Sequence, residues 1–307
     1  MVAKNKMMKD LKLEDILPDN CYHVCTNGQE SPIIMRDTED YRIVQNYLAI
    51  AAWKTGVSIL AYVLMSNHIH AAITCNDRKT ANRFIKLFKQ LYSRHLNNKY
   101  GIKQALHGID DSITLIDSLQ YLRNCIAYIL RNPLCARICT RLEEYRWSSY
   151  SCYFAKKHTN KYQTVSSLGT RERRRLLKTR DSLSGCSLLI DQEGYIANES
   201  FVRFDIVERL FKNSGKYFIF HLGTCNDSQM EYEMACKPMI RINDTELLLV
   251  VEKIISNRFH GKTLPDLDTK ARCSMIKHLY FNNKTSIPQL SRILGLPKSL
   301  VSQILSS

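Results

Sequence analysis

The feature that most constrains the fold is a nearly uninterrupted apolar run over residues 57–65, with the sequence VSILAYVLM. Such a run, bounded by turn residues, is typical of a β-strand that is covered on both faces. Ser66-Asn67 follows as a turn, and residues 68–74 alternate in character, which predicts a second strand antiparallel to the first. A fold for this chain must therefore bury this hairpin.

The flanking segments predict a small α+β domain around the hairpin. Apolar periodicity indicates strands over 21–26 and 113–116, and helices over about 38–53, 80–97 and 117–132. The pair Asn27-Gly28 would close the first strand as a turn. The resulting order is that of a ferredoxin-like antiparallel sheet with helices on one face. Because this fold hosts many unrelated functions, function must come from the site.

The rest of the chain divides into segments of different character. We expect a lysine-rich lead at 1–18, the sheet domain at 19–155, a connecting region of unclear role at 156–240 and a helical domain at 241–307. Two short helices around the turn Gly295-Leu296-Pro297 are typical of a helix-turn-helix, although a helical hairpin used only for packing gives a similar pattern. The second of them would present four residues to a DNA major groove: Lys298, Ser299, Ser302 and Gln303.

The charge balance favours a polyanionic partner. The net charge is +15, from 44 Lys and Arg against 29 Asp and Glu, and nucleic acid is the usual partner of such a chain, although charge also serves solubility. Off the apolar face of the helix at 80–97, Arg83, Lys86 and Lys89 could follow a phosphate backbone.

The apolar runs and the cysteines indicate where in the cell the protein is located. No apolar run of about 18 residues occurs and the start lacks an apolar block, so we expect neither a membrane partner nor a secretory signal. The 11 cysteines are odd in number and form no Cys-x-x-Cys pair. This favours a cytoplasmic protein with reduced thiols. If DNA is the partner, we expect the protein to be associated with the nucleoid.

Two motifs could carry chemistry. His68 and His70 lie two residues apart on a strand, so they share a face and offer a half-site for a divalent metal, although histidine pairs also occur by chance. Tyr128 and Asn132 lie one helical turn apart; a tyrosine can attack a phosphodiester, and an amide oxygen can complete a metal's shell. Pro133 disfavours helical geometry at Asn132, so the helix could bend there. Read alone, Tyr128 would be an ordinary tyrosine on the flank of a helix.

The motifs at 61–70 (AYVLMSNHIH), 128–133 (YILRNP) and 147–150 (WSSY) resemble those of the HUH transposases. In particular, they resemble those of the REP-associated tyrosine transposases and the IS200-like transposases of bacterial insertion sequences. Tyr22-His23-Val24 and residues 92–101 also fit, so the resemblance covers about 20–153. It implies that residues 19–155 form a catalytic domain.

The resemblance also implies a mechanism. His68 and His70 would hold Mg²⁺ or Mn²⁺, with Asn132 at the third ligand position. Tyr128 would attack single-stranded or hairpin DNA, giving a 5′-phosphotyrosine and a free 3′-hydroxyl. The C-terminal domain could add duplex DNA binding, and the protein could be a monomer or a homodimer.

Two departures from the family pattern concern target recognition. Asn27 stands where relatives usually carry arginine, and Asp110-Asp111 make a segment acidic where relatives carry a basic residue. Two alternatives stay open. One is a domesticated, non-cleaving DNA-binding regulator. The other is a nuclease that uses water, needs both histidines and does not need Tyr128.

Overall fold

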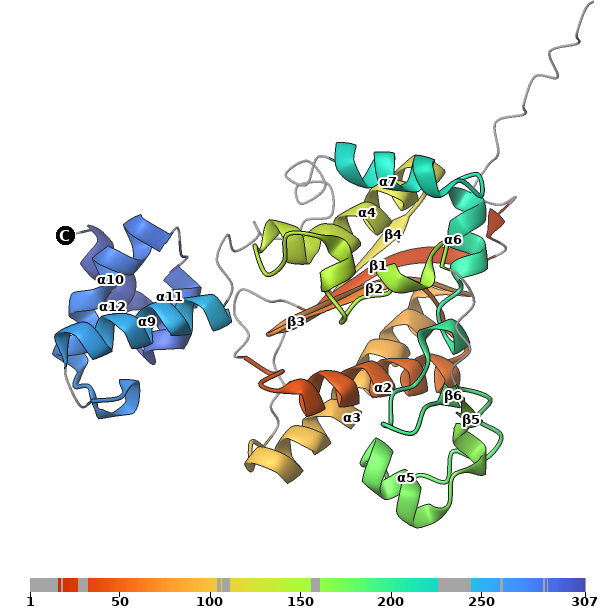
Figure 1. Cartoon of the computed structure of the whole chain (residues 1–307), viewed down its shortest axis with the longest axis horizontal. Helices are drawn as coiled ribbons and strands as arrows, with labels where there is room; N and C mark the ends of the chain where they lie inside the picture. The colour runs from red at the N-terminus through yellow and green to blue at the C-terminus, as the bar shows by residue number, and fades with distance from the viewer. Residues whose placement is uncertain are drawn as a thin grey trace, which may run out of the picture.

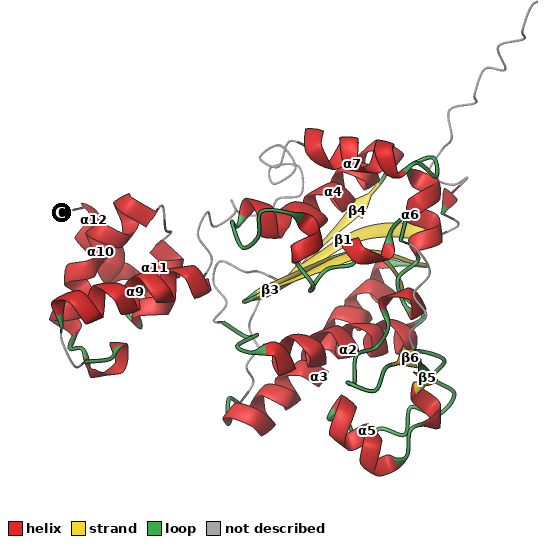
Figure 2. Cartoon of the chain, in the orientation of Figure 1, coloured by secondary structure: helices red, strands yellow, loops and turns green. Residues whose placement is uncertain are grey.

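The structure is a computed structural model that describes residues 16–17, 19–26, 33–103, 106, 111–155, 161–225, 244–259, 262–283, 285 and 287–306. The expected turn at Asn27-Gly28 lies outside these residues. Besides short 3₁₀ turns, the helices and strands (Figures 1 and 2) are β1 (Asn20–Thr26), α2 (Thr38–Thr55), β2 (Ser58–Met65), β3 (His68–Cys75), α3 (Arg78–Tyr100), β4 (Asp111–Ile116), α4 (Leu119–Cys135), β5 (Gln163–Thr164), α5 (Thr170–Leu177), β6 (Leu189–Ile190), α6 (Phe204–Leu210), α7 (Gly215–Thr224), α9 (Asp244–Arg258), α10 (Thr269–Asn283), α11 (Ile287–Leu294) and α12 (Lys298–Ser306).

The centre of the molecule is a four-stranded sheet with the order β2-β3-β1-β4. Every neighbouring pair is antiparallel. Together with α2 and α3, these strands give the expected ferredoxin-like order, so the α+β fold class is confirmed. In the register of β1 against β3, Cys25 lies opposite His70.

The helices cover both faces of the sheet, which corrects the expectation of helices on one face. Figure 1 shows α2 and α3 on one side and α4 on the other. The reason lies in the strands: β2 and β3 are buried along almost their whole length on both faces. A sheet with two apolar faces needs two covering layers, and α4 supplies the second.

Local signals set the ends of these helices. The side chains of Asp37, Asp77 and Ser118 cap the N-termini of α2, α3 and α4, each accepting a backbone N–H of the first turn. Helix α4 continues through Pro133 to Cys135 instead of ending near residue 132. Pro133 has no N–H to donate to the carbonyl one turn back, and the helix ends two residues after it.

The outer edge of β2 is closed by the aromatic motif at 145–153. The backbone carbonyl of Trp147 accepts from Leu64 N–H at 2.9 Å, and Ser149 N–H donates to the Tyr62 carbonyl at 3.0 Å. The Tyr153 hydroxyl donates to the Leu60 carbonyl at 2.6 Å. These residues therefore protect an edge strand from other pairing, which is a structural role for this motif.

Residues 161–225 pack against the sheet domain and share its hydrophobic core. The buried side chain of Asn46 donates to the Gly194 carbonyl at 2.7 Å and accepts from Ile196 N–H at 2.9 Å. Figure 1 shows α5, β5 and β6 beside α2, with α6 and α7 near α4. The segment is thus fixed along its length to the outside of the sheet domain.

The C-terminal helices α9 to α12 have a hydrophobic core of their own, built around Val251, Met275, Ile276, Leu290 and Val301. Ile33, which precedes α2, packs against this second core. No described helix is long and apolar enough to cross a membrane. Within the same part of the chain, no disulfide links the cysteines.

Candidate active site

The site begins with the face of the sheet that lies under α4. Strand alternation turns His68 and His70 of β3 to this face and Ile69 to the other. The His68 and His70 rings lie 4.9 Å apart, centroid to centroid, at 85° to each other. His68 is partly exposed, whereas His70 is buried. The sheet therefore places the two imidazoles together at the end of the β2–β3 turn.

Helix α4 brings the expected nucleophile to the same face. The Tyr128 ring stands perpendicular to the His70 ring, with the centroids 5.5 Å apart. Tyr128 is only 1% exposed. Asn132 is also buried, and its amide Nδ2 donates to the Tyr128 carbonyl at 3.0 Å. The Asn132 oxygen thus keeps its acceptor capacity for another group, as a third ligand would require.

Both histidines of β3 are held neutral. Burial lowers the pKa of His68 to about 4, and the positive charge of Arg292 adds to the effect. Burial lowers the pKa of His70 well below its usual value, with His68 and His23 contributing. Neutral imidazole is the form that can bind a metal.

The Asn67 side chain orients His68. Its Oδ1 lies 2.7 Å from His68 Nδ1. Because an amide oxygen can only accept, Nδ1 carries the proton and Nε2 presents its lone pair. Nε2 of His68 is therefore the atom prepared to bind a cation.

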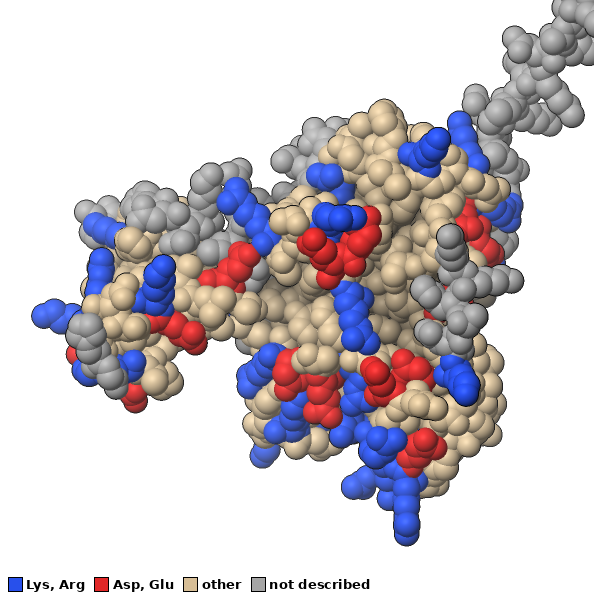
Figure 3. Space-filling model, in the orientation of Figure 1, with Lys and Arg blue, Asp and Glu red and all other residues tan. Residues whose placement is uncertain are grey.

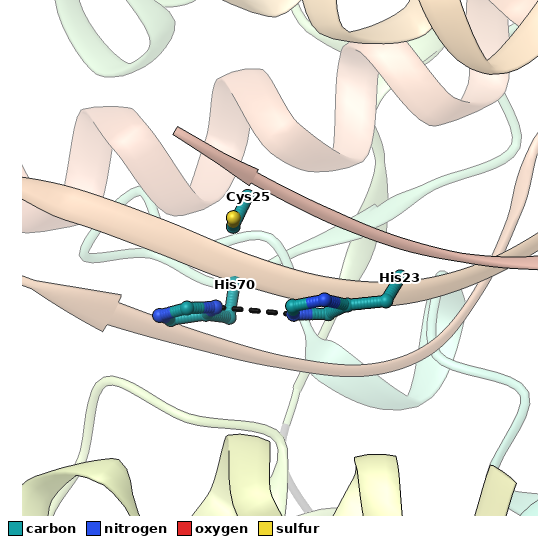
Figure 4. A group of neighbouring side chains, drawn as sticks. All are labelled: His23, Cys25 and His70. Carbon is teal, nitrogen blue, oxygen red and sulfur yellow. Dashed lines mark hydrogen bonds between the residues drawn. The ribbon is translucent and has the colours of Figure 1, made fainter. Parts of the chain in front are cut away.

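Two further residues, to which the sequence motifs assign no role, reach the site from β1. Residues His23, Cys25 and His70 offer ligand atoms within 4.8 Å of one another, and all three side chains are buried. Figure 4 shows the His23 and His70 rings end to end, with the Cys25 sulfur to one side. The usable signal was the two-residue spacing of His23 and Cys25, which puts both on one face of a strand. Which residue of β3 lies beside them depends on the register between β1 and β3, and the sequence pattern does not reveal that register.

The basic residues expected to bind DNA lie elsewhere. Arg83 and Lys86 are exposed on α3, across the sheet from the histidines, and line a shallow groove with Lys54 and Lys79. Lys89 is half-buried and paired with Asp111.

In the C-terminal domain, the four residues expected to face a groove of DNA are exposed on α12: Lys298, Ser299, Ser302 and Gln303. Helices α11 and α12 also have the expected helix-turn-helix order, with Gly295 at a positive φ of 63° in the turn. Figure 3 shows Lys and Arg side chains gathered over α5 and over the C-terminal helices. Four arginines stand on α5 itself: Arg171, Arg173, Arg174 and Arg175.

Comparison with known proteins supports the resemblance seen in the motifs. Residues 20–109 match the family described as "Transposase IS200 like". The matched segment contains His23, His68 and His70 and ends before Tyr128. A search of curated proteins gave no match.

Among solved structures, the chain is similar to one described as "Structure of the REP associates tyrosine transposase bound to a REP hairpin". The identity is 15% and the TM-score is 0.34, over 50% of this chain and 84% of that chain.

Proposed function

We propose that this chain, whose residues 20–109 match the IS200-like transposase family, is a transposase that cuts and rejoins single-stranded DNA through Tyr128. The observation that carries the proposal is the convergence of Tyr128 on the two histidines. Strand β3 and helix α4 are far apart in sequence, yet the Tyr128 ring stands 5.5 Å from the His70 ring, on the face that His68 shares. A purely structural tyrosine would need no such neighbours.

His68 and His70, with Asn132 beside them, suit a divalent cation. The donor set is two neutral imidazoles and one amide oxygen, which Mn²⁺ accepts readily and Mg²⁺ accepts when water or phosphate oxygens complete its shell. When bound, such a cation would neutralise charge on the scissile phosphate. With so few protein ligands, the remaining positions are open to the DNA.

Tyr128 would perform the covalent step. Its phenolic oxygen, after losing its proton, forms a bond to phosphorus while the bond from phosphorus to the 3′-oxygen breaks. The products are a 5′-phosphotyrosine and a free 3′-hydroxyl. A 3′-hydroxyl can attack the adduct in return and release the tyrosine. Because the phosphotyrosine ester conserves the energy of the broken phosphodiester bond, no nucleotide cofactor is needed. Since Tyr128 is 1% exposed, the proposal includes a movement that brings its hydroxyl to the DNA.

DNA would be held at two places. The α3 groove around Arg83 and Lys86 can follow a phosphate backbone of hairpin DNA. Helix α12 can enter the major groove of a duplex through Lys298 and Gln303. Because the structural neighbour is described as bound to a REP hairpin, DNA hairpins are the first substrates to test.

The decisive experiment is a covalent-adduct assay. The protein is mixed with end-labelled single-stranded hairpins and Mg²⁺ or Mn²⁺, and the products are separated on a denaturing gel. A shifted protein band is expected from the native chain, and none from Tyr128→Phe or in the presence of chelator. Tyr121→Phe, on the same helix, is the matched control and should keep the band.

The other outcomes separate the alternatives. Cleavage without an adduct, retained by Tyr128→Phe, would identify a nuclease that uses water. Binding of hairpins with neither cleavage nor adduct would identify a DNA-binding regulator.

A further inference from the structure

We propose that His23 is a positioning residue that supports His70 as a ligand of the bound cation by accepting a hydrogen bond from His70 Nδ1. The inference rests on the proposed function, because it gives His70 the role of a metal ligand. It goes further in assigning a role to a buried histidine on another strand.

The contact itself is close and enclosed. His23 Nε2 lies 3.1 Å from His70 Nδ1. The two ring planes differ by 6° and the ring centroids are 5.3 Å apart, so the rings lie almost end to end, as Figure 4 shows. His23 is fully buried and His70 is 5% exposed. Water is therefore a poor substitute for either partner.

A hydrogen bond between two neutral imidazoles allows two arrangements. If His23 Nε2 donates, then His70 Nδ1 is the acceptor and the remaining ring proton of His70 sits on Nε2. His70 then has no lone pair free for a cation. If His70 Nδ1 donates, His70 Nε2 presents its lone pair and can bind. Only the second arrangement suits a metal ligand, and metal-binding histidines characteristically donate their other N–H in this way.

The far side of His23 sets the balance between the two arrangements. Its Nδ1 is buried and has no hydrogen-bond partner among the residues that the structure describes. In the binding arrangement that nitrogen must carry a proton without an acceptor, whereas in the other it is only an unused acceptor. A buried donor left unsatisfied is the costlier of the two. Without metal, we therefore expect the protein to favour the arrangement in which His23 Nε2 donates. Metal should draw the pair into the binding arrangement, in which His70 Nδ1 donates.

The same residues could instead form a separate site for a soft metal, together with Cys25. The ring geometry argues against it. In an end-to-end contact the lone pair of the accepting nitrogen points at the donor, whereas two nitrogens that share one metal must both point at a third place. The contact between His23 and His70 is thus a hydrogen bond that supports His70, and not a pair of ligands.

The test compares two replacements of His23 by direct measurement of Mn²⁺ affinity, without DNA. In His23→Gln, the terminal amide can supply an acceptor near the place of Nε2. In His23→Phe, the ring is kept and the acceptor is lost. We expect His23→Phe to bind Mn²⁺ about 10- to 100-fold more weakly, and His23→Gln to recover most of the affinity. Cys25→Ser, the neighbour on the same strand, is the matched control and should change little.

The outcomes are distinct. Native affinity in a folded His23→Phe would overturn the inference, as would metal binding that depends on Cys25 and not on His68. Failure of the adduct assay would refute the proposed function but leave the affinity comparison meaningful. If the affinity measurements refute the role of His23, adduct formation by the native chain is still expected.

A measurement on the native chain covers the case in which His23→Phe does not fold. Nitrogen-15 spectra of labelled histidines distinguish a proton on Nδ1 from one on Nε2. On addition of Mg²⁺, His70 should show its proton on Nδ1. A His70 that keeps its proton on Nε2 with metal bound would overturn the inference.

Discussion

Replacing Asp244 by alanine should unfold the C-terminal helical domain and leave the sheet domain folded. The Asp244 carboxylate is 2% exposed and joins the start of α9 to α11. It accepts from Arg292 Nε at 3.0 Å and from a terminal Arg292 nitrogen at 2.8 Å. It also accepts from Gln289 Nε2 at 3.1 Å. The substitution removes all three hydrogen bonds and leaves a mostly buried guanidinium without this counter-charge.

The size of the effect follows from those contacts. Removing one partner of a buried ion pair costs about 3–5 kcal/mol of folding free energy. A domain of roughly 60 residues has a total stability of only about 3–9 kcal/mol at usual values per residue. The loss is therefore comparable to the whole stability of the domain. The sheet domain has a separate core, so it should be affected little.

Calorimetry of the native chain and of Asp244→Ala would measure this. The native chain should show a transition that the variant loses or shifts strongly downward, while a second transition stays in place. Asp244→Asn keeps the volume and one acceptor, so it should fall between the two. Hairpin cleavage should persist in Asp244→Ala and duplex binding should fail. An unchanged melting profile, or a single transition that moves as a whole, would refute this reasoning.

Three further outcomes are expected. The pKa of His68 is lowered from 6.5 to about 4, so between these pH values the unfolded chain binds more protons than the folded chain. The free energy of unfolding is therefore highest above about pH 6.5 and falls progressively towards pH 4, by at most about 3 kcal/mol. Urea midpoints at pH 7.5 and 4.5 should therefore differ less in His68→Asn than in the native chain, and equal differences would refute the assignment. Lys298→Ala should weaken duplex binding and reduce the slope of log affinity against log salt by about 0.9; an unchanged slope would exclude a phosphate contact there. Asn46→Ala should lower the urea midpoint by an amount equivalent to about 2 kcal/mol, since it removes two buried hydrogen bonds to the 194–196 segment. The control Asn82→Ala, at an exposed position, should cost less than about 0.5 kcal/mol. Similar midpoints for the two variants would show that Asn46 does not anchor the 194–196 segment.

Local pattern accounts for most of what could be predicted of the fold. The hairpin of β2 and β3, the helices α2, α3 and α4, and the two short C-terminal helices all occur where apolar periodicity placed them, within a few residues. Helix α4 runs three residues further than expected, from 132 to 135, and includes Pro133 in its last turn. The expectation that the helices cover one face of the sheet was wrong for another reason. Periodicity indicates which face of a helix is apolar, but it does not say which face of a sheet that helix will cover.

Two relations in the site can be read from the sequence alone, because they follow from backbone repeats of about two and 3.6 residues. His68 and His70 share one face of a strand, and Tyr128 and Asn132 share one side of a helix. The three-dimensional packing was needed to show that these two pairs meet, that Tyr128 is buried against His70, and that the His23 ring lies end to end with the His70 ring. Those relations depend on the register between β1 and β3 and on the packing of α4. Both are set by side chains distant in sequence, and no local repeat encodes them.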